Sequence, residues 1–333
     1  MRVGYLSPCW PSARCANGIA TYLENLLRHG SPAYDYSIMT YNSGACEEEV
    51  LDLSLHRRQR TAIDAVFARA LPKTFNIRYR VPEDLRAAMR SADLKVDVLE
   101  VEESFGLCYS RRRNRLPAVS RRLHGPWFIN QPLLGGRISL DDRYRMHVEG
   151  IAIKHAAGVT SPSRHVLDLV RSRYDCDLPW AEVIPNPVAP TSPEYRWQGG
   201  ENGAPTVLYV GRFDRLKGAD VLLKAFRIVG LKNRDANLQF VGPDHGLLEN
   251  GVRYDFSEYL EKSIPERDIR RRVSNLGRRS LAEICGLRKS ATVCVVSSRY
   301  ENFPLSLLEA MSAGCPASSQ PPPAPARCPA RAR

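Results

Sequence analysis

Two glutamates, Glu301 and Glu309, lie eight positions apart on either side of Pro304, a residue suited to the first turn of a helix. Carboxylates at a corner between a strand and a helix can accept hydrogen bonds from sugar hydroxyls, as an acidic residue does for the ribose in dinucleotide sites. The free backbone amides of a helix start can face phosphate oxygens. The corner therefore predicts a nucleotide-sugar site, although the helix dipole alone also favours glutamates near helix starts.

A second polar loop follows an apolar run and reads Gly211-Arg212-Phe213-Asp214-Arg215-Leu216-Lys217-Gly218. Its glycines allow a ligand to approach the backbone closely. Arg212 and Lys217 place two cations at the start of the next predicted helix, an arrangement that suits a diphosphate. The alternative for this loop on its own is a basic turn with solvated side chains.

A third loop, Asn17-Gly18, opens an apolar helical pattern near the N-terminus. Gly18 could close over the phosphates or the acceptor, and a plain helix start is equally compatible with the pattern.

These loops are positioned by strands that alternate with helices along the chain. The expected strands are Arg2–Ser7, Tyr36–Tyr41, Val96–Val101, Ala118–His124, Gly158–Ser161, Val183–Ile184, Thr206–Val210, Leu238–Val241 and Ala291–Val296. The expected helices are Ile19–Leu27, Arg57–Met89, Asp141–Ala157, Ser163–Arg173, Ala219–Val229, Ser280–Lys289 and Pro304–Ala313. Alternation of this kind predicts parallel sheets built from right-handed βαβ units, with ligands beyond the carboxyl ends of the strands.

The domain organisation follows from composition. Residues 188–203 are rich in Pro, Gly and Ser and carry no periodicity, so a linker is expected there. It separates an acceptor-side domain, 1–187, from a nucleotide-sugar-binding domain, 204–316. The predicted fold is therefore α/β, with two Rossmann-like domains whose parallel sheets face each other across a cleft.

With their flanks, these motifs resemble the donor-binding half of the group 1 (family 4) glycosyltransferases, which are retaining enzymes of the GT-B fold. The resemblance rests on Glu301-x7-Glu309 with the following Leu308–Pro316 and on the Gly211–Gly218 loop. It extends more weakly over most of the chain. The supporting motifs are His124-Gly125, Ser161-Pro162-Ser163 and Ile184-Pro185-Asn186-Pro187.

The resemblance implies a role for each matched residue. Glu309 would hold the ribose, Glu301 the transferred sugar, and His124 would reach the donor sugar from the N-terminal domain. The alternative for His124 is a buried core histidine. The catalytic residues implied are His124, Glu301, Arg212 and Lys217, and the donor-binding residues implied are Gly18, Gly211, Asn302, Phe303, Leu305 and Glu309. Cations and backbone amides would neutralise the leaving diphosphate, so neither a metal nor another cofactor is expected.

The implied function is a retaining hexosyltransferase (EC 2.4) that moves a sugar from a UDP or GDP donor to a glycan or lipid-linked saccharide in cell-envelope polysaccharide or glycoconjugate synthesis. An NAD-dependent oxidoreductase is disfavoured because no GxGxxG opens the helix after the first strand. Asp175-Cys176-Asp177 has the form of a DxD metal motif, but its position predicts a connecting turn.

Composition narrows the class of protein further. Of the 333 residues, 43% are hydrophobic and 25% are charged, as in packed globular domains, and no apolar run is long enough for a membrane span. The nine cysteines form no CxxC pair, which indicates reduced thiols and a cytoplasmic protein.

The net charge of +12 includes an arginine cluster, Arg111–Arg115, with Arg121 and Arg122 nearby. The cluster is first of all expected to be a solvated loop, and the functional alternative is contact with an anionic membrane at its inner face or with a lipid-linked diphosphate acceptor. Nucleic acid is not expected, because no aromatic residues are interleaved with these charges.

The C-terminal segment departs from the family pattern. After Pro316 the family continues with an apolar strand, whereas residues 317–333 are rich in Ala, Pro and Arg. Proline has no amide to donate to a sheet, so we expect a disordered tail and an incomplete C-terminal domain. A truncated, inactive relative that only binds nucleotide-sugar is therefore the alternative function.

Overall fold

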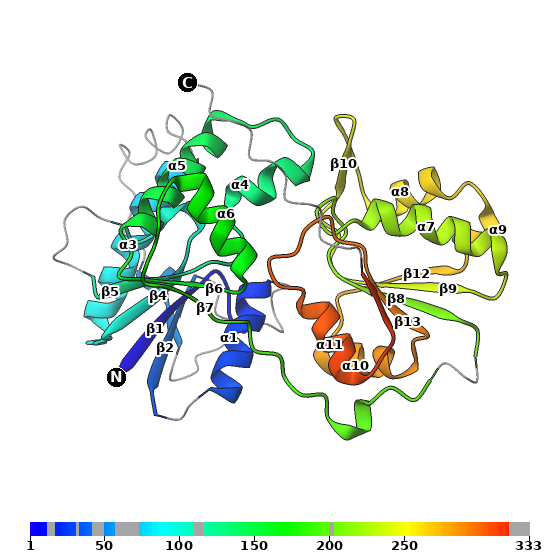
Figure 1. Cartoon of the computed structure of the whole chain (residues 1–333), viewed down its shortest axis with the longest axis horizontal. Coiled ribbons are helices and arrows are strands. Elements are labelled where there is room, and N and C mark those ends of the chain that lie inside the picture. Colours follow the sequence, from blue (N-terminus) through cyan, green and yellow to red (C-terminus); the bar gives the residue numbers. More distant parts are fainter. Residues whose placement is uncertain are drawn as a thin grey trace. The chain divides into compact units, whose positions relative to one another are not determined.

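The structure is a computed structural model that describes residues 1–11, 17–30, 33–41, 50–56, 73–109, 116–199 and 203–319. The chain divides into two compact units (Figure 1). The first unit comprises Met1–Gln131 and Arg137–Pro187, and the second comprises Pro132–Gly136 and the chain from Val188 onward.

A parallel sheet forms the centre of the first unit. Within the described residues its strand order is β3-β2-β1-β4-β5-β6-β7. The strands are β1 (Arg2–Ser7), β2 (Asp35–Thr40), β3 (Val50–Asp52), β4 (Val98–Glu102), β5 (Ala118–Arg122), β6 (Gly158–Ser161) and β7 (Ala181–Val183). The helices are α1 (Gly18–His29), α3 (Lys73–Ser91), α4 (Trp127–Asn130), α5 (Leu140–Lys154) and α6 (Arg164–Tyr174), with short turns η2 (Leu53–His56) and η3 (Ser104–Gly106). A further turn, η4 (Gln131–Leu134), starts at Gln131 and continues into the segment Pro132–Gly136 of the second unit.

Helices cover both faces of this sheet. Met39 of β2 packs in a cluster with Leu85 of α3, whereas its neighbour Ile38 packs in a cluster with Leu23 of α1. Successive side chains of a strand point to opposite faces, so α1 and α3 lie on opposite faces of the sheet. The predicted doubly wound arrangement is confirmed for the first unit.

The second unit has a parallel sheet of its own, with the order β12-β9-β8-β13-β14 in the described part of the chain. Its strands are β8 (Thr206–Val210), β9 (Asn237–Val241), β12 (Val273–Gly277), β13 (Val293–Val296) and β14 (Ala317–Ser319), and β10 (Leu247–Glu249) and β11 (Val252–Tyr254) form a hairpin. Its helices are α7 (Ala219–Lys232), α8 (Phe256–Ser263), α9 (Arg267–Arg270), α10 (Leu281–Ser290) and α11 (Leu305–Ala313), preceded by the turn η5 (Pro193–Tyr195). Figure 1 shows α7 and α8 on one face of this sheet and α10 and α11 on the other.

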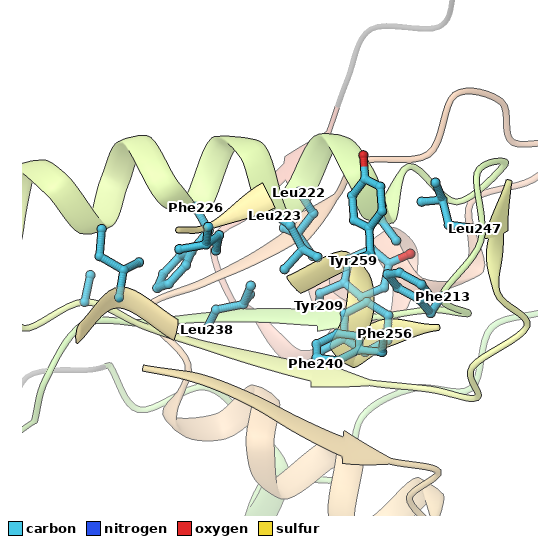
Figure 2. Close-up of a cluster of buried hydrophobic side chains, with 14 residues drawn as sticks. Tyr209, Phe213, Leu222, Leu223, Phe226, Leu238, Phe240, Leu247, Phe256 and Tyr259 are labelled. Atoms are coloured by element: carbon cyan, nitrogen blue, oxygen red, sulfur yellow. The ribbon is translucent and has the colours of Figure 1, made fainter. Parts of the chain in front are cut away.

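An aromatic core lies between α7 and the sheet (Figure 2). The rings of Tyr209 and Phe240 stack with centroids 4.6 Å apart, and Phe213 makes an edge contact with Phe240 at 6.0 Å. Phe213 is fully buried although it belongs to the loop after β8. The core therefore anchors the loop that carries Arg212 and Lys217.

A strand follows Pro316, contrary to the expectation from the sequence. Ala317–Ser319 pairs in parallel with β13, and the Cys294 amide donates to the Pro316 carbonyl at 2.8 Å. The prediction of disorder from residue 317 is therefore wrong for these three residues. Strand pairing needs only backbone groups here, and the run of prolines begins later, at Pro321. The rest of the predicted tail, 320–333, lies outside the described residues.

Residues 188–199, part of the predicted linker, pack on the second unit. The backbone amide of Trp197 donates to Ala313 and its indole Nε1 donates to Ala291, both at 2.8 Å. The amide of Thr191 also donates to the Ser312 hydroxyl, at 3.1 Å.

Arg121 and Arg122 are buried, so the expectation that they add to an exposed basic surface is wrong. Their guanidinium groups are hydrogen bonded to backbone and side-chain oxygens: Arg121 donates to the carbonyl of Leu107, and Arg122 donates to the Asn186 side chain at 2.5 Å. The cluster Arg111–Arg115 itself lies outside the described residues.

Two further findings bear on the sequence predictions. Cys9 is disulfide-bonded, whereas the other described cysteines are free thiols, so the prediction of reduced thiols fails at Cys9. None of the helices in the described ranges is both long enough and apolar enough to cross a membrane.

Candidate active site

The predicted donor loops of the second unit meet at the carboxyl ends of two adjacent strands, β8 and β13. The two loops contact each other at Gly218, which has a φ of +67° and faces the Ser297 carbonyl. A Cβ at residue 218 would lie 1.8 Å from that oxygen, so only glycine fits. The Ser297 hydroxyl then donates to the Gly218 carbonyl at 3.0 Å.

Lys217 and Glu301 form an ion pair between these loops. Lys217 Nζ lies 2.7 Å from Glu301 Oε1, and the Ser298 hydroxyl donates to the same oxygen at 2.6 Å. Glu301 Oε2 makes no hydrogen bond within the described part of the chain. The ammonium has two further donors. The pair therefore offers both an acceptor and a cation to a ligand.

Asp214 organises the loop after β8. Its Oδ2 accepts from Arg212 Nε at 2.8 Å, and its Oδ1 accepts from the Lys217 amide at 2.7 Å. The carboxylate is 8% exposed, whereas Arg212 is 35% exposed. Because Asp214 uses only Nε, the terminal nitrogens of Arg212 can face a phosphate group.

A bidentate ion pair also joins the loop after β13 to the first turn of α7, which follows the β8 loop. Arg299 donates to both carboxylate oxygens of Asp220, at 2.6 Å each, and to the Arg215 carbonyl at 2.6 Å. Asp220 lies in the first turn of α7, where the helix dipole favours an acidic residue. This pair fixes the loop of Glu301 against the loop of Lys217.

Glu309 lies on α11, one turn beyond the loop of Glu301. Its Oε2 is 2.5 Å from Nη2 of Arg288, whose side chain is 3% exposed, while the Glu309 side chain is 22% exposed. Arg288 comes from the last turn of α10. One carboxylate oxygen of Glu309 is thus held by the protein.

The start of α11 differs by one residue from the prediction. Pro304 has φ −82° and ψ 72° and precedes the helix, and the Leu305 amide donates across it to Phe303 at 2.9 Å. These angles define an inverse γ-turn, which explains why Pro304 is not the first helical residue. The Leu305 amide, predicted to face phosphate, is occupied by this bond, whereas the Phe303 amide has no partner in the described chain. Asn302 lies beside Phe303 in the same turn.

His124 belongs to the first unit, just beyond the end of β5. Glu103, a fully buried carboxylate, accepts from the amides of His124 at 2.9 Å and Gly125 at 2.6 Å. The imidazole packs edge-on against Tyr22, with centroids 4.9 Å apart. Burial, together with the nearby Arg122 guanidinium, lowers the pKa of His124 to about 3. The imidazole is therefore neutral at physiological pH.

The two predicted glycines have different surroundings. Gly18 is the first residue of α1, whose N-cap Asn17 accepts from the Ile19 amide at 2.9 Å, and the space where a Gly18 Cβ would point is open. At Gly211 a Cβ would lie 2.8 Å from the Tyr209 hydroxyl. That hydroxyl supports the loop from below, 3.0 Å from the Lys217 carbonyl.

The structure therefore brings together Gly211, Arg212, Lys217, Glu301, Asn302, Phe303, Leu305 and Glu309 in the second unit, and it places Gly18 and His124 in the first. Sequence reasoning did not single out the residues that hold these side chains in place. They are Glu103, Asp214, Asp220, Arg288, Ser298 and Arg299. The DxD-like segment forms a turn, as predicted, in which Asp175 caps the end of α6 in the left-handed conformation.

Two α/β units with parallel sheets and polar loops at the strand ends are the architecture of the GT-B fold. The structure is similar to sucrose-phosphate synthase from Thermosynechococcus elongatus, with a TM-score of 0.68 and 18% identity over 96% of this chain and 80% of that one. It is also similar to HepE of Anabaena solved with UDP-glucose, with a TM-score of 0.59 and 15% identity over 96% and 80% of the two chains.

Two family profiles match the chain. Residues 16–192 match Glycosyltransferase Family 4, and residues 191–325 match Glycosyl transferases group 1. Since the first match covers more than half of the chain, the protein belongs to Glycosyltransferase Family 4. A relative in Xanthomonas campestris, GDP-mannose:cellobiosyl-diphosphopolyprenol alpha-mannosyltransferase, is 33% identical over 122 residues. That segment spans 36% of this chain and 30% of the relative, less than two thirds of its length.

Proposed function

We propose that this protein transfers a sugar from a nucleoside-diphosphate donor to an acceptor hydroxyl, with retention of configuration and without a metal cofactor. The observation that carries the proposal is the cluster at the ends of β8 and β13, where Lys217 pairs with Glu301 and Asp214 holds Arg212 in the same loop as Lys217. Each of Glu301 and Glu309 has one carboxylate oxygen bound by the protein and a second without a partner in the described residues. Two acceptors and two cations are what a sugar diphosphate requires.

The chemical step breaks the bond between the anomeric carbon and the diphosphate oxygen and forms a bond from that carbon to the acceptor oxygen. The acceptor proton passes to the departing diphosphate on the same face, so the configuration is retained with no covalent intermediate. Negative charge grows on the diphosphate as the bond breaks, and the guanidinium of Arg212 and the ammonium of Lys217 stabilise it. Glu301 orients the sugar, and Glu309 orients the ribose.

Donor and acceptor classes are proposed from the relatives. The Xanthomonas relative is named for GDP-mannose and a diphosphopolyprenol-linked disaccharide, and HepE was solved with UDP-glucose. We therefore propose a UDP- or GDP-hexose as donor and a saccharide, free or carried on a polyprenol diphosphate, as acceptor. Synthesis of cell-envelope polysaccharide or glycoconjugate is the process that fits this pair.

The test combines binding with turnover on the full chain. Thermal shift against UDP-glucose, UDP-galactose, UDP-N-acetylglucosamine and GDP-mannose identifies the donor, because a ligand that binds the folded state raises the melting temperature. Transfer to a polyprenol-diphosphate saccharide is then followed by NMR of the new anomeric centre, with and without EDTA. We expect α-linked product from an α-linked donor and the same rate in EDTA.

Other outcomes decide against the proposal or part of it. An inverted product contradicts retention, and loss of activity in EDTA contradicts metal independence. Donor binding without transfer or hydrolysis would favour the alternative function, a nucleotide-sugar-binding protein. If no nucleotide-sugar binds, the assignment of the site is wrong.

A further inference from the structure

Arg288 is a buried cation with a single carboxylate partner. The residue is 2% exposed and lies on α10, and its Nη2 pairs with Glu309 Oε2 on the neighbouring helix α11. Its Nε is buried and has no hydrogen-bond partner within the described residues. A guanidinium in this environment depends on its carboxylate for stability, so the position of Arg288 determines the position of Glu309.

Arg288 binds only one of the two carboxylate oxygens of Glu309, so the second oxygen can bind a ligand. A planar guanidinium often takes both oxygens of a carboxylate in parallel, as Arg299 does with Asp220. Arg288 instead takes only Oε2, and Glu309 Oε1 makes no hydrogen bond in the described chain. The Glu309 side chain is still 22% exposed, so a ligand can reach that oxygen.

Holding one oxygen also fixes the direction of the other. A free glutamate on a helix samples several rotamers, and ordering them costs free energy when a ligand binds. The contact with Arg288 restricts Glu309 before the ligand arrives. The neutralising charge is buried behind α11 and does not compete with the ligand for solvent-exposed space.

We infer that Arg288 is a positioning residue that presents Glu309 Oε1 to the ribose hydroxyls and so makes the site select ribonucleotides over their deoxy forms. The inference rests on the proposed function, since it assigns the recognition of the sugar of the nucleotide within that site. Arg288 itself does not touch the ligand. It acts through Glu309, and its contribution disappears when the ribose hydroxyls are removed.

A purely structural role for Arg288 makes a different prediction. If the pair only joins α10 to α11, its loss weakens every nucleotide by the same factor. If Arg288 positions Glu309, its loss weakens only ligands that carry the hydroxyls. The ratio of two dissociation constants therefore separates the two roles.

The experiment measures the Kd of UDP and of 2′,3′-dideoxy-UDP by calorimetry on the full chain, with GDP and 2′,3′-dideoxy-GDP in parallel. We expect the wild-type protein to prefer one ribonucleotide over its dideoxy form by about tenfold or more, the effect of a hydrogen bond to a charged acceptor. In Arg288→Met the ratio should fall to within about threefold of unity, with the Kd of the dideoxy form little changed. Glu309→Gln should lower the ratio as well.

Two further variants keep the test decisive. Arg279→Met is the matched control, because Arg279 is an exposed arginine at the start of α10 whose contact with Glu283 is 3.8 Å. It should leave the ratio unchanged. If Arg288→Met does not fold, Arg288→Lys keeps a cation in the buried position without the planar fork, and its ratio should fall between the wild-type and Glu309→Gln values.

The outcomes distinguish the inference from the function on which it rests. A wild-type protein that binds UDP and dideoxy-UDP equally, or an Arg288 variant that weakens both by the same factor, overturns the inference and leaves the donor site intact. A wild-type protein that binds neither nucleotide overturns the proposed function, and the inference with it.

Discussion

The ammonium of Lys217 lies 2.7 Å from Glu301 Oε1, across 84 positions of sequence, and this contact joins the loops that follow β8 and β13. The two side chains are 27% and 19% exposed, so water screens their attraction only in part. An ion pair of this kind contributes little to stability, about 1 kcal/mol or less. Its significance is that it places a cation beside the carboxylate predicted to bind the sugar.

Lys217→Met should therefore reduce activity far more than stability. We expect kcat to fall by about 10² to 10³, the effect of removing one preorganised group that stabilises a developing negative charge. The matched control is Lys224→Met. Lys224 is an exposed lysine on α7, and its ammonium lies 3.3 Å from the Glu249 carboxylate. Initial rates and melting temperatures of both variants check the prediction. Equal rates for Lys217→Met and the wild type would contradict the role of this cation.

Asp214 should affect donor binding through Arg212. In Asp214→Asn the amide oxygen can still accept from the Lys217 backbone, but its NH2 faces the Arg212 Nε–H, so the guanidinium is released. We expect the KM for the donor to rise about tenfold with little change in stability. Asp214→Ala leaves a buried amide unpaired and should in addition lose about 1–3 kcal/mol of stability. If Asp214→Asn and Asp214→Ala both have the donor KM of the wild type, Asp214 does not position Arg212 for donor binding.

The Arg299–Asp220 pair should dominate the stability of the second unit's loops. Asp220 is 5% exposed, so Arg299→Met leaves a buried charge without its partner and should cost about 3 kcal/mol. Arg299→Met combined with Asp220→Asn should recover part of that loss, because the buried charge is then absent. Urea denaturation of the single and double variants measures both effects. A double variant that is no more stable than Arg299→Met alone would contradict this interpretation of the pair.

The sequence predicted the strand ends better than the contacts between them. The β8 and β13 loops are continuous motifs, and their flanking apolar runs predicted each strand to within about two residues. The Lys217–Glu301 contact depends on the two strands being neighbours in the sheet, which no local pattern encodes. The Arg288–Glu309 contact likewise depends on α10 packing beside α11.

Elements without an apolar pattern were missed for a physical reason. β12 reads Val273-Ser274-Asn275-Leu276-Gly277 and lies at the edge of its sheet in the described part of the chain; none of its five residues is fully buried, so it carries no apolar run. For Arg121 and Arg122 the sequence predicted exposure, whereas the structure shows them buried. Their charges suggested a solvated surface, but backbone carbonyls and the Asn186 side chain accept hydrogen bonds from the terminal nitrogens of these guanidinium groups inside the first unit.

The lowered pKa of His124 predicts a pH dependence of stability. Its folded-state pKa of about 3 lies below the ordinary value of 6.5, because burial and Arg122 disfavour the imidazolium. Below pH 6.5 the unfolded chain therefore binds a proton that the folded chain does not, and stability is lost as the pH falls towards 3. The loss is at most about 1.4 kcal/mol per pH unit.

His124→Gln removes the titrating group and should flatten this part of the profile. The free energy of unfolding, measured with urea at pH 7.5, 6.5, 5.5 and 4.5, should fall more steeply for the wild type than for the variant below pH 6.5. At pH 7.5 the two proteins differ in free energy of unfolding only through packing of the side chain. The change of this difference with pH is therefore the quantity that tests the prediction. Parallel curves down to pH 4.5 would mean that the His124 imidazole is protonated in the folded protein, against the burial and the neighbouring guanidinium seen in the first unit.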